Sequence, residues 1–462
     1  MNRTEKLFVA AFGLLGLRLG LRPIGDNSAF VHIRTGIDIV AGRGIPRTDP
    51  YSFTAAGREW VVQSWLASVV YGLAERLGGL EGVVLLNGLL YGALAAVLAL
   101  LARTGVAWRT CMATSIAIGL GLGLWAPRPL VFGLLAFAAT LLVVERARAP
   151  WLLVPIAWVW VNTHGSFVLA GVWFLVVVVV GGRARRPELM RYSAFWLGGV
   201  LLGALNPLGP KLLAFPLTLL TKSENFTRVV EWGPPTFRSP FGIVGLVAIV
   251  ALVAVLAAGR RRVPAADVAV VAVFLALGLY SQRNLAPAAV VIAPVLGRAL
   301  AAAAAADHPS GSVRVSGSAA PEIPHRTKGV DRAFAAVIAA AALVFVAVAA
   351  TSEPLDLDDT DPPPLTIPGD DVRLLTTDVD AGFVILRDGR DANVFMDDRY
   401  DMYPTEVVAD YVKLYDGSTE SLELLDNYGI TIVDWPEDLP LTAILEASPE
   451  WRRARTGEFV RR

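Results

Sequence analysis

The stretch from Asp26 to Trp60, DNSAFVHIRTGIDIVAGRGIPRTDPYSFTAAGREW, is a polar interval between two long apolar runs of the chain. It carries the acids Asp49 and Glu59 as well as His32, one of only four histidines. The whole chain has 462 residues, of which 55% are hydrophobic and 18% are charged, and its mean hydropathy is +0.54. Soluble domains carry roughly 25% charged residues. The composition therefore predicts a membrane protein in which this interval lies outside the lipid.

Apolar segments long enough to cross a hydrocarbon core of about 30 Å recur along the chain. We predict about eleven spans, at residues 6–22, 82–102, 110–126, 129–145, 150–163, 166–182, 192–206, 241–258, 264–281, 284–303 and 332–350. The expected fold class is mostly α, a polytopic transmembrane helical bundle with a small α/β domain after the last span. No small-x-small cleavage site follows the first apolar run, so we interpret that run as an uncleaved first span.

Short basic clusters decide the expected orientation, because Lys and Arg concentrate in the short cytoplasmic loops. With a cytoplasmic N-terminus these clusters all fall on one side, at Arg103 and Arg109, Arg146 and Arg148, Arg183 to Arg191, Arg260 to Arg262, and Arg314 to Lys328. We therefore predict a multi-pass protein of the plasma membrane with residues 23–81 as a large first outer loop. The break NTHGS, the segment 207–240 and the C-terminus then face the same outer side.

Composition also divides the chain into parts. We predict a transmembrane domain over 1–303, a flexible cytoplasmic linker over 304–331, the last transmembrane helix over 332–350, an acidic proline-rich stalk over 351–369 and an extracytoplasmic α/β domain over 370–462. The linker lacks a hydrophobic period and is rich in Ala, Ser, Gly and Pro. In the last domain VRLLTT, GFVILR, NVFMD and ITIVDW have the pattern of short strands, and 404–416 and 419–427 have helical patterns.

Ionisable and polar residues at the membrane edge point to function, because charged groups are costly to keep there. On the predicted outer side these candidates are Asp26, His32, Arg128, His164, Asn206, Glu231 and Arg283. Polar motifs at almost every outer turn indicate one shared outward-facing cavity. Arg283 lies where the orientation rule disfavours positive charge, and its planar guanidinium suits a phosphate or carboxylate partner.

Several of these residues also have a structural interpretation. Asp26 can cap the helix that follows it, His32 can be an interfacial histidine, and Asn206 can hold a turn before a proline. We predict no metal ligand and no cofactor, although the histidines and acids leave a divalent metal ion open as an alternative. In the last domain, FMDDRYDMYP gathers Asp397, Asp398, Arg399 and Tyr400 in a loop at a strand end, a common place for function. The expected role of these residues is an Asp–Arg pair that holds a turn, with a functional loop as the alternative.

Over most of its length, this chain resembles a group of bacterial polytopic membrane proteins related to the C-type (GT-C) glycosyltransferases. The similarity begins in the opening stretch and continues through RPLVFG, WVWVNTHGSFVLAG, LNPLGPKLL, SQRNLAP and DDRYDMYP. The first-loop pattern of the group is matched by Asp26, His32, Gly36, Pro46, Asp49-Pro50, Ser52, Thr54, Gly57 and Trp60. Ser28 stands where relatives carry a second acid, which weakens a metal-dependent mechanism. Protein mannosyltransferases and aminoarabinose transferases are more distant relatives of this group.

The resemblance implies a GT-C-like fold and transfer of a sugar from a polyprenyl-phosphate-linked donor to an acceptor at the outer face. Asp26 would be the general base. The residues implied in binding the substrate or its phosphate are His32, Arg128, His164, Asn206, Glu231 and Arg283. The acceptor is left open as a glycan, a lipid or a protein; membrane lipids are the other partners, and no nucleic acid is expected. The alternative is a non-catalytic membrane protein with the same fold, either a lipid or polymer transporter or an envelope-assembly partner.

Overall fold

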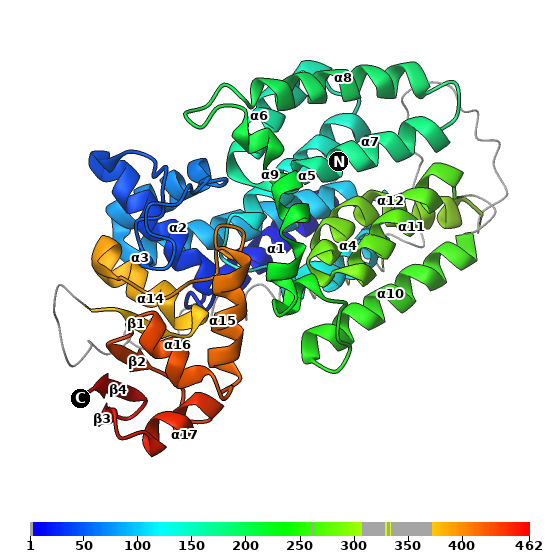
Figure 1. Ribbon diagram of the computed structural model, residues 1–462. Helices are drawn as coiled ribbons and strands as arrows, with labels where there is room; N and C mark the ends of the chain where they lie inside the picture. The colour runs from blue at the N-terminus through cyan, green and yellow to red at the C-terminus, as the bar shows by residue number, and fades with distance from the viewer. Residues whose placement is uncertain (1–2, 260–262, 307–328, 330–332, 334–371) are drawn as a thin grey trace.

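The computed structural model describes residues 3–259, 263–306, 329, 333 and 372–462, and these are mostly helical (Figure 1). The helices before residue 307 are α1 (Arg3–Gly20), α2 (Asn27–Asp38), α3 (Trp65–Leu101), α4 (Ala107–Gly121), α5 (Leu130–Glu145), α6 (Leu153–Thr163), α7 (Val168–Val180), α8 (Arg186–Leu202), α9 (Lys211–Thr221), α10 (Pro240–Gly259), α11 (Ala265–Tyr280) and α12 (Leu285–Ala306). Short helical turns lie between them, including η1 (Ile39–Arg43), η2 (Leu122–Leu124), η3 (Pro150–Leu152), η4 (Gly165–Phe167), η5 (Ser223–Phe226), η6 (Val230–Trp232) and η7 (Gln282–Asn284).

Each predicted span between residues 6 and 303 coincides with one of these helices. Three described helices are long and apolar enough to cross a membrane: Trp65–Leu101, Pro240–Ala258 and Gln282–Ala302. Others are shorter; α6 has 11 residues and covers about 16 Å at 1.5 Å per residue, less than the hydrocarbon thickness. The helices support a membrane protein, whereas the number of eleven spans is not confirmed.

The predicted parts between the bundle and the last domain fall almost wholly outside the described residues. This applies to most of the linker over 304–331, the last span over 332–350 and the stalk over 351–369. At the start of the linker the structure differs from the prediction, because α12 continues to Ala306. An alanine-rich run has high helix propensity, so the helix extends past the predicted boundary.

The first outer segment, predicted as a loop over 23–81, is largely helical. It contains α2, and α3 begins at Trp65 instead of residue 82 and runs for 37 residues. Gly78 and Gly79 have non-helical backbone angles and kink α3. Glycine adopts the positive φ of 61° at Gly79 without steric cost, so the chain bends there and continues as a helix. The irregular parts of the segment are residues 23–26 and residues 44–64.

The backbones of α2 and α3 approach closely at two glycines. A Cβ atom on Gly36 would overlap the carbonyl of Ser68, and a Cβ atom on Gly72 would overlap the backbone of Gly36. α1 approaches α3 in the same way at Gly16, where a Cβ atom would overlap the backbone of Tyr91. Small residues at such contacts are typical of helix packing in membranes. These contacts hold the C-terminal half of α2, and with it the helix that Asp26 caps, against the long helix α3.

Residues 372–462 form a small α/β domain, drawn in yellow-orange to red in Figure 1. Its sheet has the strand order β1-β2-β4-β3. The sheet pairs β1 (Leu374–Thr376) with β2 (Ile432–Asp434) in parallel, and β4 (Glu458–Arg461) with both β2 and β3 (Trp451–Arg455) in antiparallel. The helices of the domain are α14 (Asp378–Asp388), α15 (Thr405–Tyr415), α16 (Ser421–Asn427) and α17 (Pro440–Ala447), with one short turn, η9 (Gly389–Asp391). The two segments predicted to be helical, 404–416 and 419–427, correspond to α15 and α16.

Two of the runs predicted as strands are not strands. GFVILR lies in α14, whose N-terminus is capped by Thr377 Oγ1, which accepts the Asp380 N–H at 3.1 Å. NVFMD lies outside the named strands, and its Val394 makes only single bridges, to Leu374 and Ser52. Periodicity cannot separate a short apolar strand from a buried helical segment. The N-terminal cap and the tertiary contacts decide the outcome in this domain.

The C-terminal domain packs on the first outer segment. The Val394 N–H donates to the Tyr51 carbonyl at 3.2 Å, and the Phe53 N–H donates to the Val394 carbonyl at 3.1 Å. Phe383 of α14 packs on Phe30 of α2, with ring centroids 4.2 Å apart. Two segments that are far apart in the sequence therefore share main-chain hydrogen bonds and an apolar contact.

Candidate functional site

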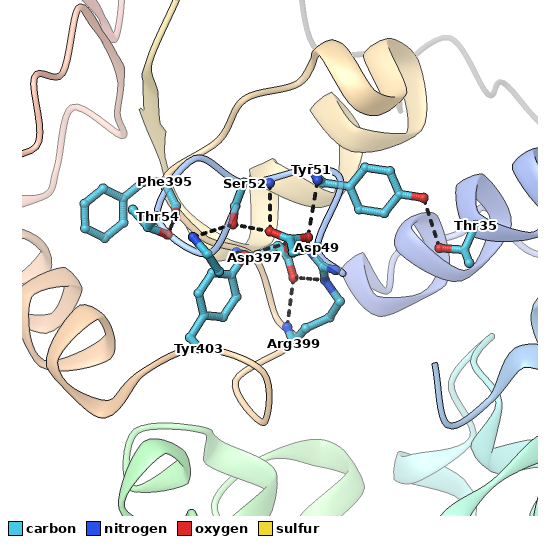
Figure 2. A network of polar contacts seen from close by, with 10 residues as sticks. Thr35, Asp49, Tyr51, Ser52, Thr54, Phe395, Asp397, Arg399 and Tyr403 are labelled. Carbon is cyan, nitrogen blue, oxygen red and sulfur yellow. Dashed lines mark hydrogen bonds and ion pairs between the residues drawn. The ribbon is translucent and has the colours of Figure 1, made fainter. Parts of the chain in front are cut away.

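Asp49 organises the irregular part of the first outer segment (Figure 2). Its carboxylate accepts the N–H groups of Tyr51 at 3.2 Å and Ser52 at 3.0 Å, and also the Ser52 hydroxyl. Asp side chains commonly hold turns by accepting such nearby backbone N–H groups. Arg399 of the C-terminal domain reaches the same carboxylate, with Nη2 2.7 Å from Oδ1. Asp49 thus holds the turn and also binds the C-terminal domain.

Arg399 is buried and bridges two acids. Its Nε lies 2.8 Å from Asp397 Oδ1, in addition to its contact with Asp49. The guanidinium also lies over the ring of Trp60, 4.3 Å from the centroid, a favourable cation–π arrangement. The Tyr403 hydroxyl donates to Asp397 at 3.0 Å. The predicted Asp–Arg pair is confirmed, with Asp397 as its acid, and the structure adds that Arg399 clamps the domain to the outer segment.

Asp26 caps α2 and faces Arg128. Asp26 Oδ1 accepts the Ser28 N–H at 3.1 Å, which confirms the capping interpretation. Asp26 Oδ2 lies 3.6 Å from Arg128 Nε, and Arg128 Nη2 hydrogen-bonds Glu231 Oε1. Three predicted site residues from separate segments therefore form one ion cluster. Burial, opposed in part by Arg128, raises the pKa of the Asp26 carboxyl above its ordinary value, so its carboxylate is a stronger base than usual.

One N–H group of the Arg128 guanidinium has no hydrogen-bond acceptor within the described part of the chain. This group is Nε, which is buried. Asp26 Oδ2, at 3.6 Å, is too far for a hydrogen bond. A buried N–H without a partner is costly. An anionic oxygen of a bound ligand would satisfy this donor.

Arg283 lies beside the same cluster. The turns η6 and η7 are joined because the Gln282 N–H donates to the Gly233 carbonyl at 2.9 Å and the Ser281 hydroxyl donates to the Glu231 carbonyl at 3.1 Å. The Arg283 guanidinium lies over the ring of Trp232, 4.3 Å from its centroid. Among residues 3–259, 263–306 and 372–462, no Asp or Glu side chain forms an ion pair with Arg283. The region around Arg128 therefore has a second cation that can bind an anion.

His32 lies near Arg128 and Arg399. Its Nδ1 lies 3.1 Å from the Ser68 hydroxyl of α3. Burial, and then the positive charges of Arg399 and Arg128, lower the pKa of His32 to about 4. The imidazole is therefore neutral near pH 7 and can exchange hydrogen bonds without adding charge to the site.

His164 and Asn206 have local structural roles. His164 Nδ1 accepts the Ser166 N–H at 3.1 Å and caps η4. Asn206 holds the turn after α8, because its Nδ2 donates to the carbonyls of Gly203 and Gly209. Within the described residues there is no group of three or more His, Cys, Asp and Glu side chains arranged to hold a metal ion.

Asp398 belongs to this region, although sequence reasoning left it out of the candidate site. Asp398 stands between the buried residues Asp397 and Arg399 in the chain and is itself half-buried. Burial, with the charge of Asp397 adding to it, raises the pKa of Asp398 to about 8. The acidic run after NVFM was the available signal. The Asp49 partner of the neighbouring Arg399 lies 350 residues away, so local sequence does not reveal that contact.

Comparison with known proteins identifies the fold. No family model matches the chain, and no curated protein matches it in sequence. Among solved structures, the archaeal oligosaccharyltransferase AglB from Archaeoglobus fulgidus, in complex with an inhibitory peptide and a dolichol-phosphate, has a TM-score of 0.56 at 12% identity, over 94% of this chain and 70% of that chain. The apo form of the Archaeoglobus fulgidus oligosaccharyltransferase has a TM-score of 0.53 at 12% identity, over 92% and 68%. The chain has the GT-C fold.

The predicted relation to the GT-C glycosyltransferases is thus confirmed in the fold, together with the mostly α bundle. The long apolar helices of this chain support a membrane protein. A fold does not by itself assign a reaction, so the function has to be argued from the site.

Proposed function

We propose that this protein is an integral membrane glycosyltransferase that transfers a sugar from a polyprenyl-phosphate-linked donor to an acceptor at the outer face of the plasma membrane. The observation that carries the proposal is the cluster of Asp26, Arg128 and Glu231, with Arg283 beside it, on a GT-C fold. The fold neighbour AglB is in complex with a dolichol-phosphate, which supports a lipid phosphate as the donor. Its peptide ligand is compatible with a protein acceptor, while glycan and lipid acceptors stay open.

In the proposed reaction Asp26 is the general base. It accepts the proton of an acceptor hydroxyl while that oxygen forms a bond to the anomeric carbon of the donor sugar. The bond between the anomeric carbon and the phosphate oxygen breaks, and the lipid phosphate leaves with the bonding electron pair. The raised pKa of Asp26 favours this proton transfer.

In the proposed reaction the leaving phosphate binds Arg128 and Arg283. Arg128 Nε offers a buried donor that lacks a partner, and Arg283 is held against Trp232. Donors that are fixed before the reaction stabilise developing negative charge effectively, since they need no reorganisation. Glu231 hydrogen-bonds Arg128 and holds its guanidinium in place.

The charges near the predicted inner ends of the helices argue against a transport path. Arg298 pairs with Asp267 at 2.7 Å and with Glu145 at 2.7 Å, and Arg103 pairs with Glu5 at 2.8 Å. These groups neutralise one another, whereas the cluster around Asp26 keeps an unsatisfied guanidinium donor. This contrast supports a one-sided site with a cytoplasmic N-terminus and an extracytoplasmic C-terminal domain, which we propose together with about eleven spans.

The test is sugar transfer in membranes that contain the Asp26→Asn variant. With radiolabelled polyprenyl-phosphate hexoses as donors, loss of the base should lower transfer by about 10²- to 10⁴-fold. Glu59→Gln is the matched control, because Glu59 is an exposed acid of the same outer segment and pairs with Lys211 at the surface. Sugar transfer by Asp26→Asn at the wild-type rate would show that Asp26 is not the general base. Donor binding without transfer by the wild-type protein would favour the non-catalytic alternative.

A further inference from the structure

Asp38, the last residue of α2, is a buried acid that two arginines of its own segment contact. Arg34 precedes Asp38 by four residues, about one helical turn, and its Nε lies 3.3 Å from Asp38 Oδ1. After Asp38 the chain winds as the π-helical turn η1, a form whose hydrogen bonds join residues five apart. Arg43 follows Asp38 by five residues, and its Nη1 lies 2.9 Å from the same Oδ1. The change of helix type therefore brings both arginines to one carboxylate.

A third arginine reaches Asp38 from the C-terminal domain, where α14 lies beside α2 (Figure 1). Arg390, in the turn η9 that follows α14, has its Nε 3.6 Å from Asp38 Oδ2. Arg34 Nη1 also donates to the Leu386 carbonyl in the last turn of α14, at 3.3 Å. Gly389 leaves room for this contact, since a Cβ atom there would overlap the Arg34 guanidinium. Arginines from two distant parts of the chain thus meet at one acid.

The charges of this cluster do not balance. Three guanidinium groups surround one carboxylate, and no second acid pairs with any of the three among the residues that the structure describes. Of the acids beside Arg390 in the chain, Asp388 pairs with Arg387 at 2.7 Å, and Asp391 is exposed. Two positive charges are therefore left over, and like charges held this close repel each other. A bound anion would remove that repulsion.

The carboxylate also leaves guanidinium donors unused. Arg34 Nε is buried and has no hydrogen-bond partner in the described part of the chain, although Asp38 is close to it. Arg390 Nε, at 3.6 Å, is too far from Asp38 for a hydrogen bond. The side chains of Arg43 and Arg390 are 50% and 48% exposed, so a ligand can reach them from outside the protein. The N–H groups that Asp38 does not bind are therefore available to that ligand.

The excess charge and the kind of donor suit a phosphate group. A guanidinium presents its N–H groups as a planar fork, which matches two oxygens of a phosphate. A phosphate monoester carries about 1.5 to 2 negative charges near pH 7, close to the two positive charges that Asp38 leaves unbalanced. A carboxylate ligand would supply a single charge, and a neutral sugar would supply none.

We propose that Arg34, Arg43 and Arg390 form a binding site for a phosphate group at the contact between α2 and the C-terminal domain. The site uses other residues than the cluster around Asp26 and does not depend on the proposed reaction. The phosphate belongs either to a soluble compound or to the headgroup of an anionic lipid, because the guanidinium groups would bind the same oxygens in both. Since Arg43 and Arg390 come from different parts of the chain, the bound group would join the C-terminal domain to the first outer segment.

Protection of single arginines from phenylglyoxal tests the site. The full-length protein is placed in phosphatidylcholine nanodiscs at constant ionic strength, and mass spectrometry follows the modification of each arginine. One sample receives inorganic phosphate, and another has phosphatidic acid in the nanodisc and no added phosphate. A ligand at about ten times its Kd should slow the modification of Arg43 and Arg390 by about tenfold. Arg452, an exposed arginine of β3 in the same domain, is the control and should not be protected.

The two samples also identify the source of the phosphate. Protection by inorganic phosphate supports the site with a soluble compound as its ligand, and protection by phosphatidic acid alone supports it with a lipid headgroup. Arg43→Gln should remove most of the protection of Arg390, because the two arginines share one ligand, whereas Arg452→Gln should leave that protection unchanged. Absence of protection in both samples, equal protection of Arg452, or unchanged protection of Arg390 in Arg43→Gln would overturn the proposal. Sugar transfer enters none of these measurements, so they decide the site whatever reaction the protein carries out.

Discussion

Replacing Arg399 by methionine should release the C-terminal domain from the first outer segment. Met approximates the length of Arg but cannot neutralise Asp49 and Asp397, whose side chains are both 0% exposed. Removing one partner of a buried ion pair costs about 3–5 kcal/mol, because an uncompensated charge stays buried. At 1.36 kcal/mol per factor of ten, this cost corresponds to an increase of roughly two to three and a half orders of magnitude in the constant for local opening.

Hydrogen exchange of the full-length protein in detergent measures this opening. The backbone N–H groups of Tyr51 and Ser52, which donate to Asp49, should exchange at least about a hundredfold faster in Arg399→Met. The matched control is Arg228→Met. Arg228 also contacts the C-terminal domain, through Asp416, but both side chains are about half exposed, and such a pair contributes at most about 1 kcal/mol. Unchanged exchange in Arg399→Met, or equal acceleration in both variants, would refute the clamp.

Two further predictions concern the packing of α2. Gly72→Ala places a methyl group against the backbone of Gly36 and should lower the free energy of unfolding by about 1–3 kcal/mol. The control Gly198→Ala, with no atom within 4 Å of the added carbon, should be neutral or slightly stabilising. Thermal unfolding of the two variants in parallel checks this, and equal melting temperatures would contradict the close approach of α2 and α3. The pKa of His32 falls from 6.5 to about 4 on folding, so the unfolded chain binds the proton more tightly and the free energy of unfolding decreases as the pH falls from about 6.5 to 4. His32→Gln should lose less stability over that interval in pH-dependent melting, and an equal loss in both proteins would assign the effect to another group.

Hydrophobic patterning was sufficient for the helical bundle, since each apolar run predicted between residues 6 and 303 became a helix. It failed where backbone geometry decides. The predicted loop over 23–81 includes Gly78 and Gly79, but α3 continues through them with a kink. In the C-terminal domain GFVILR became α14, because Thr377 caps it. Local caps and tertiary contacts, which periodicity does not contain, set these boundaries.

Part of the candidate site could be predicted from the sequence, because charged residues at the membrane edge are costly and therefore stand out. That reasoning found Asp26, Arg128, Glu231 and Arg283, which the structure brings together. It also selected Asn206, whose side chain holds only its own turn. It missed the contribution of the C-terminal domain, because a contact between the two ends of a chain leaves no trace in a single sequence.

The clamp between Asp49 and Arg399 has a consequence for biosynthesis. Its two partners are separated by 350 residues, so at ribosomal rates of 5–20 residues per second the second follows the first by on the order of 20 to 70 seconds. In the proposed topology, residues 23–81 have by then crossed the membrane, with Asp49 still hydrated and its turn without the arginine. In that topology the bundle inserts helix by helix, but the contact that holds the turn of Asp49 forms only once Arg399 has been made, and a chain that ends before residue 399 lacks it.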